Sequence, residues 1–395
     1  MSSPTSPRVL AVATRFPHGS ETFIERKVRV LRDAGLDITV AAPWLYPQAP
    51  DLPPVPTLQL PQVRNPRTWG AAARAVARDA RARRLLPDLV RDESRATWLA
   101  PIAAGGYDIV HFEFSGIAVT VSDLLPRLRP AKLVVSCRGH AEQIAPLFDP
   151  SRVDALRGVF EQVDLVHCVS DDMAATVRSY GAPAEKVLVN RPAVDTGLWT
   201  GVGRVDPTER GTPDAPLRVL SVGRLHWKKG FDDAIRAVAA ARDAGLAVEY
   251  RIAGSGPEQE KLEYLRASLG LGTEVTLLGW QDQAAVREQL GWADAFLLPS
   301  LSEGISNSAL ESLAAGVPVV STRCGGLDEV LVSPEVGTLV EVGDVAAMAH
   351  ALAPLADPDR RAAVAAAGAA RAHDAFDLSR QAQVFLEAYR SLAGA

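Results

Sequence analysis

The chain has 395 residues, a net charge of −5 at neutral pH and an apolar fraction of 47%. This length suits two domains of ordinary size, and this apolar fraction supports large buried cores. The acidic balance leaves no basic footprint over the whole chain, so we expect no nucleic-acid partner. No apolar run approaches the roughly 18 residues that a membrane-spanning helix needs. The first residues lack the pattern of a signal peptide, so none is expected.

The cysteines carry information about the compartment. Cys137, Cys168 and Cys324 are odd in number and far apart in the sequence. Neither a disulfide framework nor a metal-binding spacing follows from this pattern, and a reducing compartment is favoured. We therefore expect a cytoplasmic protein without a structural metal.

Apolar runs that fit buried parallel strands recur through the first half of the chain. They lie at residues 8–14, 37–42, 107–112, 132–136 and 164–169, with a helix expected at 21–34. Strands that alternate with helices are typical of a doubly wound parallel sheet, in which ligands lie beyond the carboxyl ends of the strands. Arg138, Gly139 and His140 directly follow one such strand, and Ser20 and Glu21 lie in the loop after the first. Ser20 and Glu21 could equally cap a helix or contact a ligand.

Residues 69–98 are rich in alanine and arginine and have a helical period. A basic helix could lie on an anionic membrane surface, at the inner face of the membrane, and present a lipid-linked substrate. A solvated helix face explains the same pattern more plainly.

The second half begins after residues 196–216, whose glycine, proline and charge predict a linker. Leu217–Val222 predicts a strand that runs into a turn ending at Gly230. In that turn Arg224 can form paired hydrogen bonds to phosphate oxygens, and Lys229 can act as a movable point charge.

A later strand ends in Gly254-Ser255-Gly256-Pro257-Glu258, but Gln259 occupies the place of a third glycine, which argues against a dinucleotide fingerprint. Another strand ends at Gly279.

The most informative stretch is 298–321. A buried strand at 294–298 is followed by a loop with Glu303 and Gly304, then by a helix expected at 309–315 with Asn307 and Ser308 as its polar N-cap. The free N–H groups and the positive dipole end of such a helix favour a phosphate in front of it. Glu303 would precede the helix, and Glu311 would lie about one turn inside it.

This stretch resembles the signature of a known family. The pattern Pro-Ser-x2-Glu-Gly-x6-Glu-x2-Ala-x-Gly-x-Pro-Val-Val over residues 299–320 resembles that of retaining glycosyltransferases of family 4, the group 1 glycosyltransferases. Residues 223–230 resemble the family's G-R-L-x3-K-G segment, and residues 16–23 resemble the FPxxSETF opening of members that build polysaccharides. The sequence departs from the pattern at Ser312 and at 305–307, which leaves the identity of the sugar open.

The resemblance implies an α/β protein of the GT-B fold, with two doubly wound, Rossmann-like parallel-sheet domains facing across a cleft. Residues 1–195, joined by a C-terminal helix at 376–395, would bind the acceptor, and residues 217–375 would bind the nucleotide-sugar donor. The implied catalytic residues are Glu303, His140, Lys229 and Arg224. The implied donor-binding residues are Arg224, Lys229, Gly254, Gly279, Glu303, Gly304, Ile305, Ser306, Asn307 and Glu311. Acceptor contacts would come from Ser20, Glu21 and Arg138.

The implied reaction is transfer of a sugar, with retention, from a nucleoside-diphosphate sugar to a hydroxyl of a sugar, a lipid-linked or a small-molecule acceptor. No cofactor beyond this co-substrate is expected, and no metal. The only Asp-x-Asp is Asp357-Pro358-Asp359, which lies between two expected helices where capping explains it, and cationic side chains can neutralise a departing diphosphate. Two alternatives remain open at this stage: an epimerase or hydrolase of nucleotide sugars, and a non-catalytic nucleotide-sugar sensor.

Overall fold

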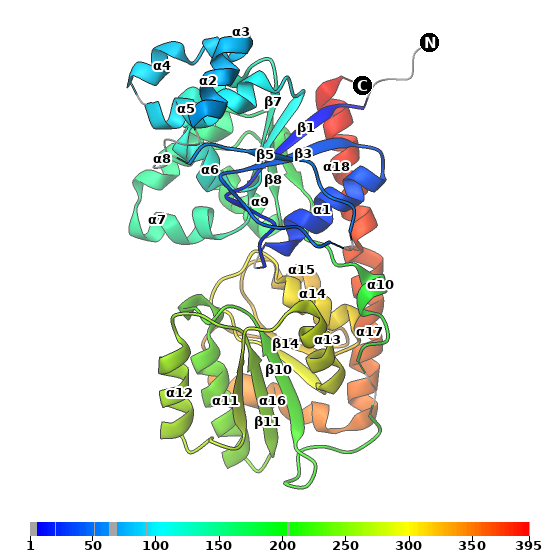
Figure 1. Cartoon of the computed structure of the whole chain (residues 1–395). Helices are drawn as coiled ribbons and strands as arrows, with labels where there is room; N and C mark the ends of the chain where they lie inside the picture. The colour runs from blue at the N-terminus through cyan, green and yellow to red at the C-terminus, as the bar shows by residue number, and fades with distance from the viewer. Residues whose placement is uncertain are drawn as a thin grey trace. The chain divides into compact units, whose positions relative to one another are not determined.

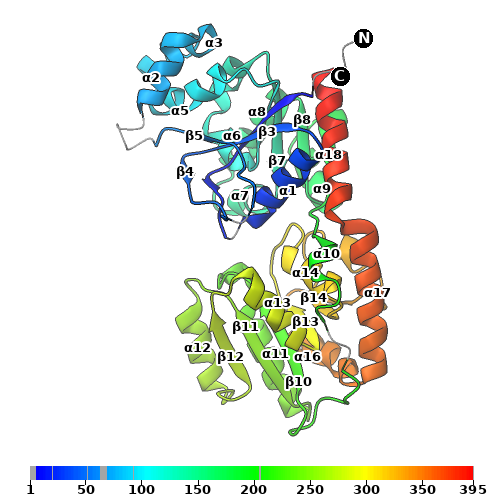
Figure 2. The same cartoon turned by 45° about the vertical axis from the view of Figure 1, so that its right-hand side comes forward.

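The computed structural model describes residues 6–19, 21–50, 52–62, 69–91, 93–203 and 206–394. The chain divides into two compact units. Unit 1 contains Met1–Asn190 and Gln381–Ala395, and unit 2 contains Arg191–Arg380. Each unit is a parallel sheet between layers of helices (Figure 1, with a second view in Figure 2).

In the described part of unit 1, seven strands form one sheet in the order β5-β3-β1-β6-β7-β8-β9, with every neighbouring pair parallel. The strands are β1 (Arg8–Val12), β3 (Asp37–Ala42), β5 (Thr57–Gln59), β6 (Ile109–Phe112), β7 (Lys132–Cys137), β8 (Leu165–Cys168) and β9 (Val187–Val189). A separate parallel ribbon pairs β2 (Arg15–Phe16) with β4 (Trp44–Leu45). The strand order reverses at β1, between β3 and β6, and ligands of doubly wound sheets bind at such a switch point.

Helices cover both faces of this sheet. On one face, α1 (Thr22–Asp33) and α18 (Leu378–Ala393) share a core with the strands. Ile24, Val28 and Leu31 recur at helical spacing, so they form one buried stripe on α1. The helices of the other core are α3 (Ala80–Arg83), α5 (Glu93–Ala104), α6 (Ser115–Thr120), α8 (Ser151–Gln162) and α9 (Asp171–Ser179). The remaining helical segments are α2 (Trp69–Arg78), α4 (Leu86–Arg91), η2 (Ser122–Leu128), η3 (His140–Ile144), α7 (Ala145–Phe148) and η4 (Ala184–Lys186).

The predicted basic helix at 69–98 is wrong as a single element. The chain instead forms α2, α3, α4 and the beginning of α5. Asp79 explains the first break, because its side chain accepts a hydrogen bond from the backbone N–H of Arg81 and so begins a new helix. Some of the basic charge is used internally, since Arg83 donates to the carbonyls of residues 76 and 77. Within the described ranges, no helix combines the length and apolar character needed to cross a membrane.

The described part of unit 2 contains a six-stranded parallel sheet in the order β12-β11-β10-β13-β14-β15. The strands are β10 (Leu217–Val222), β11 (Val248–Ala253), β12 (Val275–Gly279), β13 (Ala295–Leu298), β14 (Val319–Thr322) and β15 (Thr338–Val340). The strand order reverses at β10, which lies between β11 and β13. The loops that follow β10 and β13 therefore flank the switch point of this sheet.

Two helical layers enclose the unit 2 sheet. One core contains side chains of α11 (Phe231–Asp243), α12 (Gln259–Ser268) and α16 (Val345–Leu352). The other contains side chains of α10 (Thr196–Trp199), α13 (Gln283–Trp292), α14 (Asn307–Ala314), α15 (Leu327–Val330) and α17 (Pro358–Phe376). Two short 3-10 turns, η5 (Trp227–Lys229) and η6 (Ala353–Ala356), complete the described elements of this unit.

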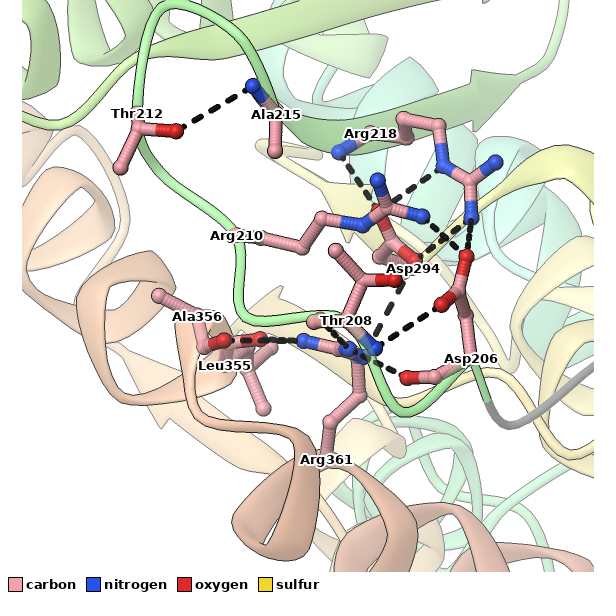
Figure 3. A network of polar contacts seen from close by, with 10 residues as sticks. All are labelled: Asp206, Thr208, Arg210, Thr212, Ala215, Arg218, Asp294, Leu355, Ala356 and Arg361. Atoms are coloured by element: carbon pink, nitrogen blue, oxygen red, sulfur yellow. Dashed lines mark hydrogen bonds and ion pairs between the residues drawn. The ribbon is translucent and has the colours of Figure 1, made fainter.

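The predicted linker at 196–216 is instead part of unit 2. Trp199 is 1% exposed in its core. Figure 3 shows how the rest of the segment is held: Arg210 and Arg218 converge on Asp206 and Asp294. Arg218 donates to both carboxylate oxygens of Asp294 at 3.0 Å. The composition of residues 196–216 indicated a solvated linker, because composition carries no information on these ion pairs.

The boundaries of the units also differ from the predicted ones. Unit 1 ends at Asn190 rather than at residue 195, and its C-terminal part begins at Gln381 rather than at residue 376. The physical reason is local: α17 ends at Phe376, and Val194 donates from its backbone N–H to the carbonyl of Phe376 at 2.8 Å. This contact holds residue 194 in unit 2.

Two histidines, His111 and His167, form a buried polar network in the centre of unit 1. The hydroxyl of Ser136 lies 2.7 Å from His111 Nε2 and 2.7 Å from His167 Nδ1. His167 Nε2 lies 2.7 Å from the carbonyl of Asn190, and His111 Nδ1 lies 2.6 Å from the hydroxyl of Tyr389. The network thus connects β6, β7 and β8 to α18.

This network predicts a pH dependence of stability. Burial, assisted by nearby Arg138, lowers the pKa of His167 from 6.5 to about 3. Below pH 6.5, His167 is protonated in the unfolded chain but stays neutral in the folded protein. The free energy of unfolding therefore falls by about 1.4 kcal/mol per pH unit for this group until the pH reaches the pKa of the folded state. Urea unfolding of wild type and His167→Gln between pH 7 and pH 5 measures the difference. Equal slopes in the two proteins would contradict the assignment.

The network of Figure 3 predicts a large effect of one substitution. Asp294 has a side chain only 1% exposed, and Asp294→Ala leaves Arg210 and Arg218 without their buried partner. We expect a loss of about 3 kcal/mol, measured by urea unfolding. Asp243→Ala is the matched control, because that carboxylate is 69% exposed and pairs with its neighbour Arg242. A loss no larger than that of the control would rule out the anchoring role.

Candidate functional site

The loops at the carboxyl ends of the unit 2 strands gather most of the residues that the sequence singles out. They comprise 223–230 after β10, 254–258 after β11, 279–282 after β12, 299–306 after β13 and 323–326 after β14. Because parallel strands end at the same edge of the sheet, side chains on these loops share one rim.

A buried ion pair joins two of the loops. Lys229 Nζ contacts Glu303 Oε1, and the Ser300 hydroxyl donates to the same oxygen at 2.8 Å. The side chains of Lys229 and Glu303 are 16% and 9% exposed. Burial alone would raise the pKa of the Glu303 carboxyl, but Lys229, Lys228 and Ser300 together hold this pKa below its usual value. Glu303 is therefore an ionised carboxylate at neutral pH, with one oxygen occupied.

Glycines allow the backbones of these loops to touch. Gly230 has φ +62°, and a Cβ on it would lie 2.0 Å from the carbonyl oxygen of Pro299. Beside it, the N–H of Leu301 donates to the carbonyl of Lys228 at 2.7 Å. A side chain at position 230 would separate Lys229 from the Glu303 loop. In the Lys229-Gly230 dipeptide, the lysine thus supplies the charge, and the glycine allows the close backbone contact that positions the lysine beside the Glu303 loop.

The loop after β14 supports Glu303 from the other side. Gly325 has φ +55°, and a Cβ there would lie 1.9 Å from the carbonyl oxygen of Glu303. Gly326 donates from its N–H to the carbonyl of Gly304 at 2.7 Å. Gly254 instead joins the loops after β10 and β12, because a Cβ on it would lie 1.8 Å from the carbonyl oxygen of Gly223 and its N–H donates to the carbonyl of Gly279 at 2.7 Å.

The helix after the Glu303 loop begins earlier than predicted. It starts at Asn307 with Ser306 as its N-cap, so the predicted cap at Asn307 and Ser308 is wrong. In the described structure no side chain caps this helix, and Asn307 Oδ1 is buried without a hydrogen-bond partner. The N–H groups of its first turn are therefore open to an external acceptor such as an anion.

The other predicted donor residues have different surroundings. Ile305 is 7% exposed and packs in the unit 2 core, so only its backbone can face a ligand. Glu311 is half-buried on α14. Ser312, one of the departures from the family pattern, is fully buried and donates to the carbonyl of Ser308 at 2.7 Å. This serine is a packing residue of α14 and leaves the loop in front of the helix unaltered.

The cations around Glu303 include one that the sequence argument missed. Lys228 is half-buried, and its pKa is lowered by burial and by the charges of Lys229 and Arg224, although Glu303 opposes the shift. Arg224 is exposed on the same turn. Lys228 and Lys229 thus lie beside the Glu303 carboxylate, and Arg224 lies near Lys228 on the same turn. The consecutive lysines in the sequence were the available signal.

His140 lies at the carboxyl rim of the unit 1 sheet. It is exposed and begins the turn η3, directly after Gly139 with φ +125°. Glu142 holds that turn: its carboxylate accepts from the N–H of Gly139 at 3.0 Å and from the hydroxyl of Ser115. Glu142 is 1% exposed and is a positioning residue that the sequence argument missed.

Arg138 is bound within unit 1. Its guanidinium donates to the Glu113 carboxylate at 2.8 Å and to the Glu113 carbonyl at 2.9 Å, and it lies 4.4 Å from the centre of the Phe23 ring. Lys27, 3% exposed, contacts the other oxygen of Glu113. Sequence alone did not single out Lys27 or Glu113, because a lysine inside an amphipathic helix is ordinarily solvated.

The alternatives for the loop after β1 are partly resolved. Ser20 lies outside the described residues. Glu21 occupies the N-cap position of α1, but its side chain makes no capping hydrogen bond in the described structure. Helix capping, the plainer of the two explanations, is therefore wrong for the Glu21 side chain.

The Asp-x-Asp tripeptide is a helix cap, as predicted. Asp357 accepts at 2.8 Å from the N–H of Asp359 and begins α17. Across the described ranges, no group of three or more histidine, cysteine or acidic side chains is arranged to hold a metal ion.

The fold and this rim define a class of protein. Two Rossmann-like units with parallel sheets make up the GT-B fold, and solved GT-B structures resemble the chain over nearly its whole length. Sucrose-phosphate synthase from Thermosynechococcus elongatus has a TM-score of 0.74 at 21% identity, covering 98% of this chain and 99% of that one. Anabaena HepE in complex with UDP-glucose has a TM-score of 0.73 at 18% identity, covering 98% and 100%.

Comparison of sequences specifies the family. The model described as Glycosyltransferase Family 4 matches residues 17–198, and the model described as Glycosyl transferases group 1 matches residues 205–371. A GDP-mannose-dependent phosphatidylinositol monomannoside mannosyltransferase of Mycolicibacterium smegmatis is 31% identical over 67% of this chain and 72% of its own length. The chain belongs to the group 1 glycosyltransferases of the family 4 type, a family of transferases. The family inferred from residues 299–320, the group 1 glycosyltransferases of family 4, is confirmed.

Two further relatives are named for polysaccharide biosynthesis. WcaL of Escherichia coli K12, named for colanic acid biosynthesis, is 35% identical over 51% of this chain and 50% of its own length. AmsK of Erwinia amylovora, an amylovoran biosynthesis glycosyltransferase, is 28% identical over 86% and 88%. The chain thus spans about half the length of WcaL and most of AmsK.

The glycine contacts predict the effect of a small substitution near Glu303. Gly325→Ala should reduce turnover at least tenfold, because its Cβ collides with the Glu303 carbonyl and displaces the carboxylate. Gly343→Ala is the matched control: it shares a positive φ of +78° but has nothing within 4 Å. Both should lose about 1–2 kcal/mol of stability from backbone strain. Equal turnover in the two variants, measured on folded protein, would refute the positioning role.

Proposed function

We propose that the protein is a retaining glycosyltransferase that moves a sugar from a nucleoside-diphosphate sugar to an acceptor hydroxyl. The observation that carries this proposal is the buried pair of Lys229 and Glu303, beside the uncapped start of α14 and at the switch point of the unit 2 sheet. Solved GT-B neighbours that contain UDP or UDP-glucose support a donor of this class.

The charges of this site suit the two halves of a breaking glycosyl phosphate bond. Negative charge develops on the departing diphosphate, where Arg224, Lys228 and Lys229 and the free N–H groups of α14 can stabilise it without a metal. Positive charge develops on the sugar ring, where the ionised carboxylate of Glu303 can stabilise it. Because Lys229 and Glu303 contact each other directly, both charges are in position before the donor binds.

The remaining predicted roles complete the proposal. Glu311, one turn inside α14, would hold the ribose, and the backbone near Gly279 would contact the base. His140 would contact the transferred sugar. The C1–O bond to the diphosphate breaks and a C1–O bond to the acceptor forms on the same face. The acceptor hydroxyl proton passes to the departing phosphate oxygen, so charge and atoms balance.

The acceptor belongs, in this proposal, to polysaccharide, glycolipid or natural-product biosynthesis in the cytoplasm. The names of WcaL and AmsK support a polysaccharide role. Exposed arginines on α2 and α3, Arg74, Arg78 and Arg81, support a peripheral contact with an anionic lipid surface.

Lys229→Ala tests the diphosphate role. The variant loses a cation in contact with the leaving group, so we expect kcat to fall at least about 100-fold. Lys261→Ala is the matched control, because that lysine pairs with Asp232 and Glu258 on the surface of the same unit, and it should retain activity. Product formation from UDP-glucose and GDP-mannose with a panel of glycan acceptors is the measurement. Full activity of Lys229→Ala would refute the assigned role.

The same assay separates transfer from the alternatives. A product formed from donor alone would favour a hydrolase or epimerase, whereas donor binding without turnover across the panel would favour a sensor. Binding is followed independently by thermal shift, because a ligand that binds only the folded state raises the apparent stability.

A further inference from the structure

An exposed aromatic pair lies at the carboxyl end of β3 in unit 1, apart from the donor chemistry of unit 2. Trp44 is 47% exposed and Tyr46 is 46% exposed. The two residues are separated by Leu45, which is partly buried against the core. Residues two apart in an extended chain point to the same side, so the two rings share one face.

The pair is held on a rigid support. Trp44 is the register partner of Arg15 in the β2–β4 ribbon, and the N–H of Tyr46 donates to the carbonyl of Phe16 at 2.8 Å. Phe16 itself is 1% exposed and belongs to the core beneath the sheet. The aromatic rings are therefore fixed by backbone pairing and by a buried neighbour, and do not sit on a free loop.

Polar groups border the aromatic pair. The ring of His18 lies 6.2 Å from the ring of Tyr46 at an angle of 45°, and Arg15 Nη1 lies 3.5 Å from His18 Nε2. The N–H of Glu21 donates to the carbonyl of His18 at 2.9 Å. Arg15 and His18 thus lie beside the rings, and Glu21 follows them at the start of α1, with its carboxylate in the electrostatic field of both, at the switch point of the unit 1 sheet.

The carboxylate of Glu21 has an unused position. Its Oε2 atom is buried and has no hydrogen-bond partner among the described residues. Burial raises the pKa of this carboxyl, against the charges of His18 and Arg15. A buried polar atom without a partner is costly, and in native proteins it calls for an explanation. A donor supplied by a ligand would satisfy it.

We propose that Trp44, Tyr46 and Glu21 form a subsite for a sugar ring of the acceptor. A pyranose presents an apolar C–H face, which packs on aromatic rings, and hydroxyls at its edge, which donate to a carboxylate. The inference rests on the proposed transfer and makes the acceptor a saccharide. A lipid chain would leave the buried oxygen of Glu21 unsatisfied, and a phosphate would be repelled by Glu21.

The test uses the full chain and four free disaccharides as probes: maltose, cellobiose, lactose and diacetylchitobiose. Saturation-transfer NMR and titration calorimetry measure binding to wild type, Trp44→Ala, Trp44→Phe and Tyr46→Ala. We expect at least one probe to bind wild type, with at least fivefold weaker binding in both alanine variants and near-normal binding in Trp44→Phe. Glu21→Ala should weaken binding more than Glu21→Gln, because glutamine keeps an acceptor oxygen.

Tyr264→Ala is the matched control, since Tyr264 is 76% exposed on α12 in unit 2, and it should bind the probes as wild type does. The thermal shift with UDP-glucose should be the same for Trp44→Ala as for wild type, which shows that the variant is folded. Absence of binding by all four probes would overturn the proposal, as would binding that survives both alanine substitutions.

One outcome would assign the aromatic pair to a membrane instead. If Trp44→Ala and Tyr46→Ala weaken binding to phosphatidylglycerol vesicles while no disaccharide binds wild type, the sugar subsite is refuted. Disaccharide binding that depends on Trp44, in a protein that shows no donor turnover, would count against the proposed transfer while the sugar subsite itself stands.

Discussion

The arrangement of the proposed donor site depends on one buried ion pair, Lys229 with Glu303, and on the glycines that let its two loops meet. Charges that leave water need a partner at close range, and the partner must be held there by backbone contact. Gly230 against the carbonyl of Pro299 and Gly325 against that of Glu303 provide those contacts. The electrostatics of the site therefore follow from backbone geometry, and the switch point of the sheet decides where this happens.

In unit 1 the buried charges at the rim of the sheet neutralise one another. Glu113 is fully enclosed between Lys27 and Arg138, so these groups neutralise one another and stabilise the rim of the sheet. The side chains that this rim exposes to solvent include Arg15, His140 and the aromatic pair of Trp44 and Tyr46. The contrast is chemical: unit 2 presents cations and helix N–H groups that suit a diphosphate, whereas unit 1 presents rings and a hydrogen-bonding edge that suit neutral, hydroxylated molecules.

Strongly periodic or strongly apolar segments were predictable from sequence within one or two residues at each end, and two strands were predicted to the residue. Asp37–Ala42 and Leu217–Val222 were predicted with the bounds that the structure has. The start of α14 was displaced by two residues, because Asn307 and Ser308 are good caps in isolation and only the surrounding loop makes Ser306 the cap. The segment 196–216 was misassigned, because glycine, proline and charge are equally typical of a linker and of a segment held by ion pairs.

The sequence by itself determined the fold class, the family and the loops for which we propose donor binding, since these depend on local periodicity, on glycine positions and on short motifs. Only the tertiary structure decided which side chains are partners. Lys228, Glu142 and Glu113 become informative only through their burial and through contacts with residues remote in the sequence, such as the contact of Glu113 with Lys27, which lies 86 residues earlier. Ion pairs such as Lys229 with Glu303 join residues that are remote in sequence, and no local pattern records a contact that forms only when parallel strands assemble side by side.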